Sequence, residues 1–392
     1  LAAKYATGVE GAAFMAASQV PRLFFDAIFA SAISASFIPI FVEYLEKRGR
    51  KEAFALANRF ITLISTVTVC LMLLGMLFAE PITRLFVPGY EVETIALCIP
   101  LLRMLFPTML FTAIAFSFVG ILQSLDEFNI PAALSVVSNT IIIIYYIFFN
   151  DRLGVYGLTA AFPLGWAMQA FIQLPSLWKK DYHFRPDFRF RDDGLRRIGK
   201  LMLPVMDSTS IQPINFVINS RIASLLPNGE ENGTALQYAI TLYTIIVGVF
   251  VLAIANIIFP QLSRMTGEQG KEEFGKTVKV TLRSMMFLLI PMMAGLMVLA
   301  EPVVRLIYQR GQFQAEDTLL TSTALFFFSV GMAGYGVQTI LSRAFYANQD
   351  GKMPFLSGGV SIPGNWVLCS ILLEPMGLGG LALAAALSTT AA

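Results

Sequence analysis

The chain repeats its own landmarks about 221 residues further along. Residues 79–85 read AEPITRL, and residues 300–306 read AEPVVRL. Gly154 and Gly377 occupy matching contexts 223 positions apart, so the alignment drifts by only two residues over a long distance. So small a drift indicates that one ancestral half was duplicated, and each half should therefore fold into the same succession of elements.

Composition places this duplicated chain in a lipid bilayer. Hydrophobic residues make up 56% of its 392 residues, charged residues only 14%, and the mean hydropathy is +0.67. Apolar stretches are long enough to cross about 30 Å of hydrocarbon at roughly 20 residues per helix. The predicted spans are residues 16–42, 54–79, 94–123, 130–149, 155–177, 200–226, 236–262, 280–300, 318–346 and 354–373, with a partial span from about 376.

The connections between spans differ in charge, and this difference predicts the topology. Residues 178–200 contain eight basic and four acidic side chains, and residues 43–52 and 264–283 are also net positive. Positively charged connections stay on the cytoplasmic side, so we expect these three segments to be cytoplasmic.

An even number of spans separates equivalent points of the repeat, so both halves should have the same orientation. They would then be related by a pseudo-two-fold axis along the membrane normal. We predict an all-α polytopic membrane protein with an N-terminal lobe, residues 1–198, and a C-terminal lobe, residues 199–392. The first and last helices are expected to be incomplete.

Polar side chains inside spans are costly in hydrocarbon and suggest a pathway. One stripe follows span 200–226, where Ser208, Gln212, Asn215 and Asn219 are spaced to share a helical face. Asp207 lies beside this stripe and Arg221 follows it. We predict that the stripe lines a substrate cavity; the alternative is a helix–helix contact held by amide groups.

A second group of polar residues lies in the first predicted span. Gln19, Arg22 and Asp26 follow one another at spacings of three and four, which places them on one helical face. An arginine in hydrocarbon must face water, a partner or an anion. We therefore predict that these residues also line the substrate cavity, while an internal Arg22–Asp26 pair is the equally weighted alternative.

Enzyme chemistry has little support in this sequence. The single histidine, His183, lies in the basic connection, no span carries paired acids, and no phosphate-binding glycine loop is present. Cys70, Cys98 and Cys369 lack metal-site spacing. We expect no catalytic residues, no cofactor, no metal site and no nucleic-acid partner.

Several segments together resemble the MurJ (MviN) lipid II flippases of the multidrug/oligosaccharidyl-lipid/polysaccharide exporter superfamily. The resemblance covers nearly the whole chain and rests on residues 20–40, 105–107, 238–260, 307–313 and 344–354.

This resemblance implies a V-shaped bundle of two six-helix lobes in the bacterial cytoplasmic membrane. It implies a lipid II flippase, which moves the undecaprenyl-pyrophosphate-linked peptidoglycan precursor from the inner to the outer leaflet by alternating access. The alternative is a related exporter of another lipid-linked oligosaccharide or of a small cation. The resemblance does not extend to an oligomeric state.

The chain departs from the family where arginines are common. Phe25 and Asp26 occupy positions where family members carry an arginine after the proline matching Pro21, and Thr241 replaces another. Arg22 is the candidate substitute. Asp207, Asn219 and Asn365 are candidate ligands for a coupling Na⁺, although oxygen ligands alone do not define a metal.

Overall fold

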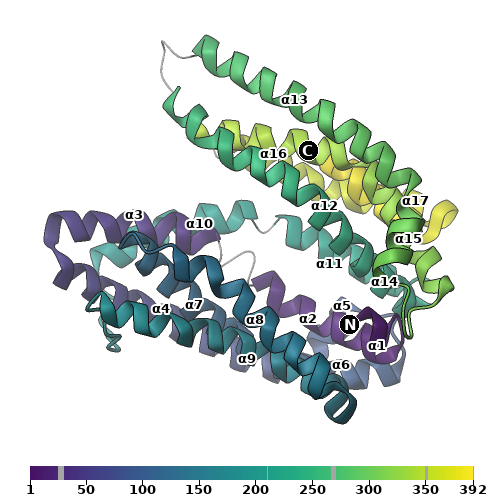
Figure 1. Cartoon of the computed structure of the whole chain (residues 1–392), viewed down its shortest axis with the longest axis horizontal. Helices are drawn as coiled ribbons and strands as arrows, with labels where there is room; N and C mark the ends of the chain where they lie inside the picture. The colour runs from purple at the N-terminus through teal and green to yellow at the C-terminus, as the bar shows by residue number, and fades with distance from the viewer. Residues whose placement is uncertain (25–30, 210, 266–270, 349–351, 392) are drawn as a thin grey trace. The chain divides into compact units, whose positions relative to one another are not determined.

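The computed structural model describes residues 1–24, 31–209, 211–265, 271–348 and 352–391 (Figure 1). These residues form seventeen α-helices and no strand, which confirms the predicted all-α class. Asp26 lies outside the described residues, and the side chains of Asp207, Ser208 and Gln212 are also outside what the structure describes.

The first half of the chain contributes α1 to α9. Their bounds are α1 Ala2–Tyr5, α2 Val9–Phe24, α3 Ser31–Arg48, α4 Arg50–Leu77, α5 Ala79–Phe86, α6 Val92–Leu105, α7 Pro107–Ser124, α8 Asn129–Phe148 and α9 Asn150–Lys179.

The second half contributes α10 to α17. Their bounds are α10 Asp193–Thr209, α11 Ile211–Ser224, α12 Gly229–Arg264, α13 Lys271–Val298, α14 Ala300–Tyr308, α15 Ala315–Val330, α16 Met332–Ala347 and α17 Lys352–Ala391.

Among the described residues, seven candidate spans are long and apolar enough to cross a membrane, and α15 with α16 adds an eighth if that bent pair is one span. The bend between α15 and α16 is 48° and falls at Gly331. The chain is thus a multi-span membrane protein, as its composition predicted.

The duplication seen in the sequence reappears in the element bounds. Helices α4 and α13 are both 28 residues long and begin 221 positions apart, at Arg50 and Lys271. Two long helices, α9 and α17, are interrupted by a non-helical residue at Gly154 and Gly377, both with positive φ. Glycine adopts this conformation at little steric cost, so the same break is encoded in both halves.

Glycines rather than prolines interrupt α9 and α17. Proline usually kinks or ends a helix, yet Pro163 and Pro291 lie inside α9 and α13. Pro107 does begin a new helix, α7, immediately after α6 ends. The first turn of a helix tolerates proline because its N–H would lack a helical partner there anyway.

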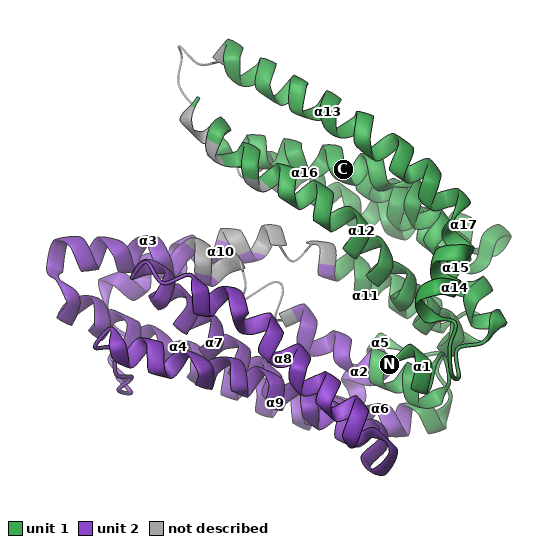
Figure 2. Ribbon diagram, viewed as in Figure 1, with its two compact units in different colours: residues 1–15, 86–94, 214–392 green, residues 16–85, 95–213 purple. Residues whose placement is uncertain are grey.

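The described residues separate into two compact units (Figure 2). Unit 1 comprises residues 1–15, 86–94 and 214–392, and unit 2 comprises residues 16–85 and 95–213. The predicted pseudo-two-fold relation between lobes 1–198 and 199–392 stays a prediction.

Unit 1 has a core formed mainly by α12, α13, α15, α16 and α17, with fully buried Leu289, Leu325 and Met332. Its N-terminal residues join this core, because the Tyr238 hydroxyl donates to the Ala6 carbonyl at 3.1 Å. The Gln312 amide likewise donates to the Ala3 carbonyl at 3.0 Å. Unit 1 therefore combines residues from both halves of the repeat.

Unit 2 has its own core, in which Phe37 of α3 stacks on Phe41 and on Phe60 of α4. Helix α10 lies along α3 and contributes Leu195 and Ile198 to this core (Figure 1). Tyr182, in the connection before α10, belongs to the same core.

Candidate functional site

Two predicted polar residues of α11 meet α17 inside unit 1. The Asn215 side-chain amide donates to Ser361 Oγ at 3.0 Å, and Asn365 Nδ2 donates to Asn219 Oδ1 at 2.9 Å. The residues are four apart on both helices, so each pair lies one turn from the other. Asn219 is 5% exposed and Asn365 is fully buried.

Cys369 completes this cluster, one turn beyond Asn365. Its Sγ lies 3.4 Å from Asn219 Oδ1 and 3.7 Å from Asn365 Oδ1. Sequence reasoning missed both Cys369 and Ser361, although the spacing of 361, 365 and 369 on one helical face was a usable signal. We call Asn215, Asn219, Ser361, Asn365 and Cys369 the amide cluster.

The amide cluster is neutral and bonded mostly within itself. Asn219 Oδ1 already accepts a hydrogen bond, whereas Asn215 Oδ1 is buried with no partner among the described residues. The described residues contain no group of three His, Cys, Asp or Glu side chains that could hold a metal ion. A cation bound here would rely on amide oxygens that are shared with the α11–α17 contact. This is the contact that the helix–helix interpretation predicts; cavity lining by Asn215 and Asn219 stays a prediction.

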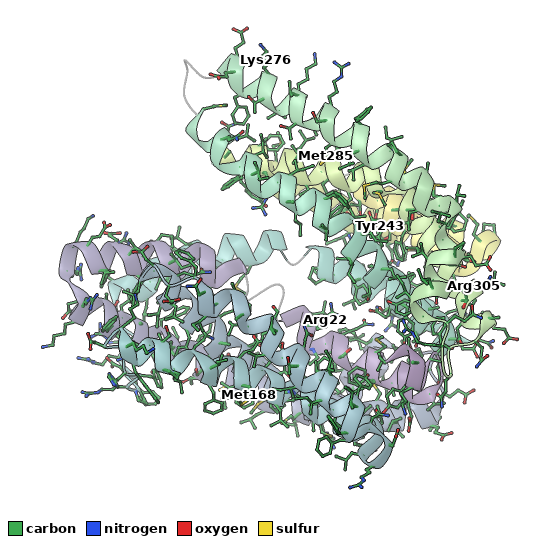
Figure 3. The ribbon with its side chains drawn as sticks, in the orientation of Figure 1. Arg22, Met168, Tyr243, Lys276, Met285 and Arg305 are labelled. Carbon is green, nitrogen blue, oxygen red and sulfur yellow. The ribbon has the colours of Figure 1, made fainter. Side chains whose placement is uncertain are left out.

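The candidates on α2 differ in exposure. Gln19 is 7% exposed, whereas Arg22 is exposed near the C-terminal end of the helix (Figure 3). Within the described part of the chain, no ion pair involves Arg22. Arg221, near the end of α11, is also exposed. Arg22 therefore presents an accessible positive charge near the end of α2.

A charged network that sequence reasoning missed ties the α9–α10 connection, residues 180–192, to α4 in unit 2. Arg59 of α4 forms ion pairs with Asp187 at 3.0 Å and with Asp192 at 2.5 Å. Arg189 pairs with the same Asp187 carboxylate at 2.7 Å. The hydrogen bonds from Arg189, with a further one from Arg59, hold the pKa of Asp187 well below its usual range.

Two further contacts fix this connection and α10. Tyr182 is 1% exposed, its hydroxyl donates to Asn58 Oδ1 at 2.8 Å, and burial raises its pKa. On α10, Arg197 pairs with Glu43 of α3. Hydrogen bonds from Arg197 and then Lys47 lower the pKa of Glu43 to about 2. The connection is thus ordered by specific bonds to α4, and α10 by its ion pair with α3.

Comparison with known proteins places the fold in one family. The family model described as "Lipid II flippase MurJ" matches residues 2–392. A Vibrio cholerae protein named "Probable lipid II flippase MurJ" is 30% identical over 393 residues, covering 97% of this chain and 74% of that protein. A Treponema pallidum protein of the same name is 26% identical, covering 96% of this chain and 72% of that protein.

Solved structures agree with this placement. A structure titled "Lipid II flippase MurJ, inward closed conformation" superposes with a TM-score of 0.86 at 26% identity, covering 99% of this chain and 80% of that one. An inward-facing multidrug resistance MATE family transporter has a TM-score of 0.80 at 14% identity, covering 100% of this chain and 91% of that one. The second likeness shows a shared fold alone. The resemblance read from the residues is confirmed, and the chain belongs to the lipid II flippase MurJ family.

Proposed function

We propose that this chain is a flippase that moves lipid II from the inner to the outer leaflet of the bacterial cytoplasmic membrane. The observation that carries the proposal is the family match over residues 2–392, joined by a multi-span helical fold. The substrate is moved without being chemically changed, so the function needs binding groups and not a catalytic set.

The pyrophosphate of the substrate requires positive charge on the protein. Moving an anionic headgroup out of water is costly unless fixed cations offset the lost hydration. Arg22 supports this role because it is exposed and is the one basic residue of α2. Gln19 and Asp26 are proposed neighbours in the same cavity, and Ser208, Gln212, Asn215, Asn219 and Arg221 are the proposed polar lining from the other half.

The transport cycle is proposed to alternate between inward-open and outward-open arrangements of the two lobes. A negative-inside potential acts on an unloaded site carrying Arg22 with about 2.3 kcal/mol per charge per 100 mV. The loaded site is neutralised by the substrate anion, so the potential biases mainly the return step. Loss of the potential should then slow transport.

Coupling to Na⁺ is a separate proposal. Its candidate ligands are Asp207, Asn219 and Asn365, of which the last two are hydrogen-bonded to each other. Replacing Na⁺ by K⁺ at constant potential tests this proposal: slower transport supports it, and an unchanged rate rejects it without affecting the flippase proposal.

Complementation tests the proposed function. In bacteria depleted of their own lipid II flippase, expression of this protein should restore growth and cell shape. Arg22→Ala should abolish the rescue at an unchanged protein level, whereas Arg152→Ala, which removes an exposed arginine at the start of α9, should preserve it. Failure of the correctly inserted parent protein to rescue would reject lipid II as the substrate and favour the related exporters.

A double variant separates substrate binding from an internal ion pair. If Arg22 binds substrate, then Arg22→Ala combined with Asp26→Ala should remain inactive. Restored rescue in the double variant would instead show that Arg22 serves only to neutralise Asp26.

A further inference from the structure

The α9–α10 connection presents phenylalanine and arginine side chains in alternation to its surroundings. Residues 183–191 read HFRPDFRFR and form no helix. Phe188 is 69% exposed, and its ring contacts Phe190 edge-on at 6.0 Å between centroids. Phe184 and Phe190 are also exposed, although large apolar side chains are unfavourable in water. These exposed rings require an explanation.

Hydrogen bonds hold the connection against residues 58–62 of α4. Asn58 accepts hydrogen bonds from Tyr182 and from the Arg185 amide, and Thr62 accepts one from the Asp187 amide at 3.0 Å. Residues 60–77 of α4 contain no charged side chain, whereas Arg59 precedes them directly. The bonds from Asn58 to Thr62 therefore fix the connection where α4 passes from its charged end into its apolar stretch. In a membrane, this transition marks the interface between headgroups and hydrocarbon.

Some charged side chains of this connection have ion-pair partners and others do not. Asp187 is neutralised by Arg59 and Arg189. Among the described residues, no side-chain hydrogen bond or ion pair engages Arg185 or Arg191, and both are exposed. Two arginines are thus available to phosphate, which a guanidinium can contact through two parallel hydrogen bonds.

Exposed aromatic rings next to available arginines are the composition of segments that lie in a membrane interface. The net positive charge of residues 178–200 also predicts that the connection faces the cytoplasmic leaflet, whose anionic lipids attract basic segments. We propose that residues 183–191 form a binding site for anionic phospholipid headgroups, in which Arg185 and Arg191 contact phosphate while Phe188 and Phe190 insert among the upper acyl segments. This site is independent of the transported substrate.

Tryptophan fluorescence can test the proposed lipid site. Phe188→Trp is placed in a background of Trp166→Phe, Trp178→Phe and Trp366→Phe, which removes the native tryptophans. The protein is reconstituted in two kinds of vesicle with the same overall lipid composition. In one, a fixed fraction of the lipid is brominated phosphatidylglycerol; in the other, the same fraction is brominated phosphatidylcholine. We expect several-fold stronger quenching by the anionic lipid. The attraction of one arginine to an anionic membrane surface corresponds to an enrichment of anionic lipid near that arginine on the order of fivefold.

Charge variants identify the source of this preference. Arg185→Gln with Arg191→Gln should equalise quenching by the two lipids. The matched control, Lys276→Gln with Lys279→Gln, removes two exposed positive charges from α13, in another predicted cytoplasmic segment, and should keep the preference.

Three results would overturn the proposal. In the first, the Phe188→Trp reporter is not quenched and emits as in water. In the second, both lipids quench this reporter equally. In the third, the α13 control loses the preference for the anionic lipid as strongly as the arginine variant does. The first would show that the rings do not enter the membrane and would favour a protein partner. The other two would show that this site does not select anionic headgroups.

Discussion

Helices α4 and α13 are copies of one element, yet their surroundings differ. Both have 28 residues and both are followed directly by a short helix that begins Ala-Glu-Pro. Arg59 of α4 is tied to two aspartates, whereas its counterpart in α13 is Val280, which is 58% exposed. In the most apolar stretch of α4, 33% of the residues are buried, compared with 17% in the most apolar stretch of α13.

The difference shows which features came from duplication and which were added afterwards. The length of α4 and α13 and the breaks at Gly154 and Gly377 are common to both halves. The ion pairs of Arg59 on α4 are made by the α9–α10 connection. This connection joins the two copies and therefore exists only once. We infer that the connection stabilises α3 and α4 and leaves α13 dependent on lipid and its own helical neighbours.

Removing the buried anchor of the connection should have the largest effect. Tyr182→Ala deletes a ring that is 1% exposed and packs edge-on against Phe54, so we expect a loss of about 3 kcal/mol in unfolding free energy. Tyr182→Phe removes only the hydrogen bond to Asn58 and should cost about 1 kcal/mol. Denaturant unfolding in mild detergent measures both. Equal stability of Tyr182→Ala and the parent would mean that the connection does not stabilise α4.

Removing the ion pairs between Arg59 and the α9–α10 connection should have the next largest effect. Arg59→Ala leaves Asp187 and Asp192, both 15% exposed in their side chains, without their shared partner, and should cost roughly 2 kcal/mol. Val280→Ala, the equivalent change in α13, should have little effect because Val280 is largely exposed. Proteolysis of the connection, followed by mass spectrometry, should show faster cleavage in Arg59→Ala alone. Similar losses in both variants would remove the proposed asymmetry between the copies.

Acid should weaken the same region. The folded-state pKa values of Asp187 and Glu43 are depressed, that of Glu43 to about 2 from 4.5. Their stabilising contribution is therefore complete above the ordinary carboxyl values and lost as pH falls from about 4.5 toward 2. Thermal unfolding between pH 7 and pH 3 should show a decline confined to the acid end. Arg197→Ala should reduce this decline, and an identical pH profile in that variant would exclude the Glu43 contribution.

The smallest effect is expected where the two halves are most alike. Glu80 pairs with Arg84, and Glu301 pairs with Arg305, in the equivalent short helices α5 and α14. All four side chains are about half exposed, so Glu80→Ala and Glu301→Ala should each cost less than about 0.5 kcal/mol. A change above about 1 kcal/mol in either variant, measured by denaturant unfolding, would mean that one copy has acquired a structural role.

Several spans are predicted correctly because hydrocarbon imposes a simple rule of length and polarity. The predicted span 54–79 corresponds to α4, and span 130–149 corresponds to α8. The predicted spans 16–42 and 200–226, in contrast, do not appear as single candidate spans among the described residues. Periodicity could not locate the break between α6 and α7 at Phe106, since apolar residues continue through it. The break in α17 at Gly377, in contrast, was anticipated by the boundary drawn near residue 376.

The site was less accessible to sequence reasoning because polar residues in membranes serve packing as well as transport. Spacing placed Asn215 and Asn219 on one face, but it could not show that Ser361 and Asn365 lie opposite them on α17. The partners of Arg59, Asp187 and Asp192, are more than 120 residues away from it in the chain. Such long-range pairs leave no periodic signal.

Transfer of lipid II between the leaflets of reconstituted vesicles tests the central claim most directly. Lipid II is introduced into both leaflets, and the outer fraction is followed by an impermeant reagent after the initial outer pool has been removed. We expect that the protein replenishes the outer pool, that Arg22→Ala does so much more slowly, and that protein-free vesicles do not. Folded, correctly inserted protein that fails to replenish the pool under a negative-inside potential would contradict the assignment.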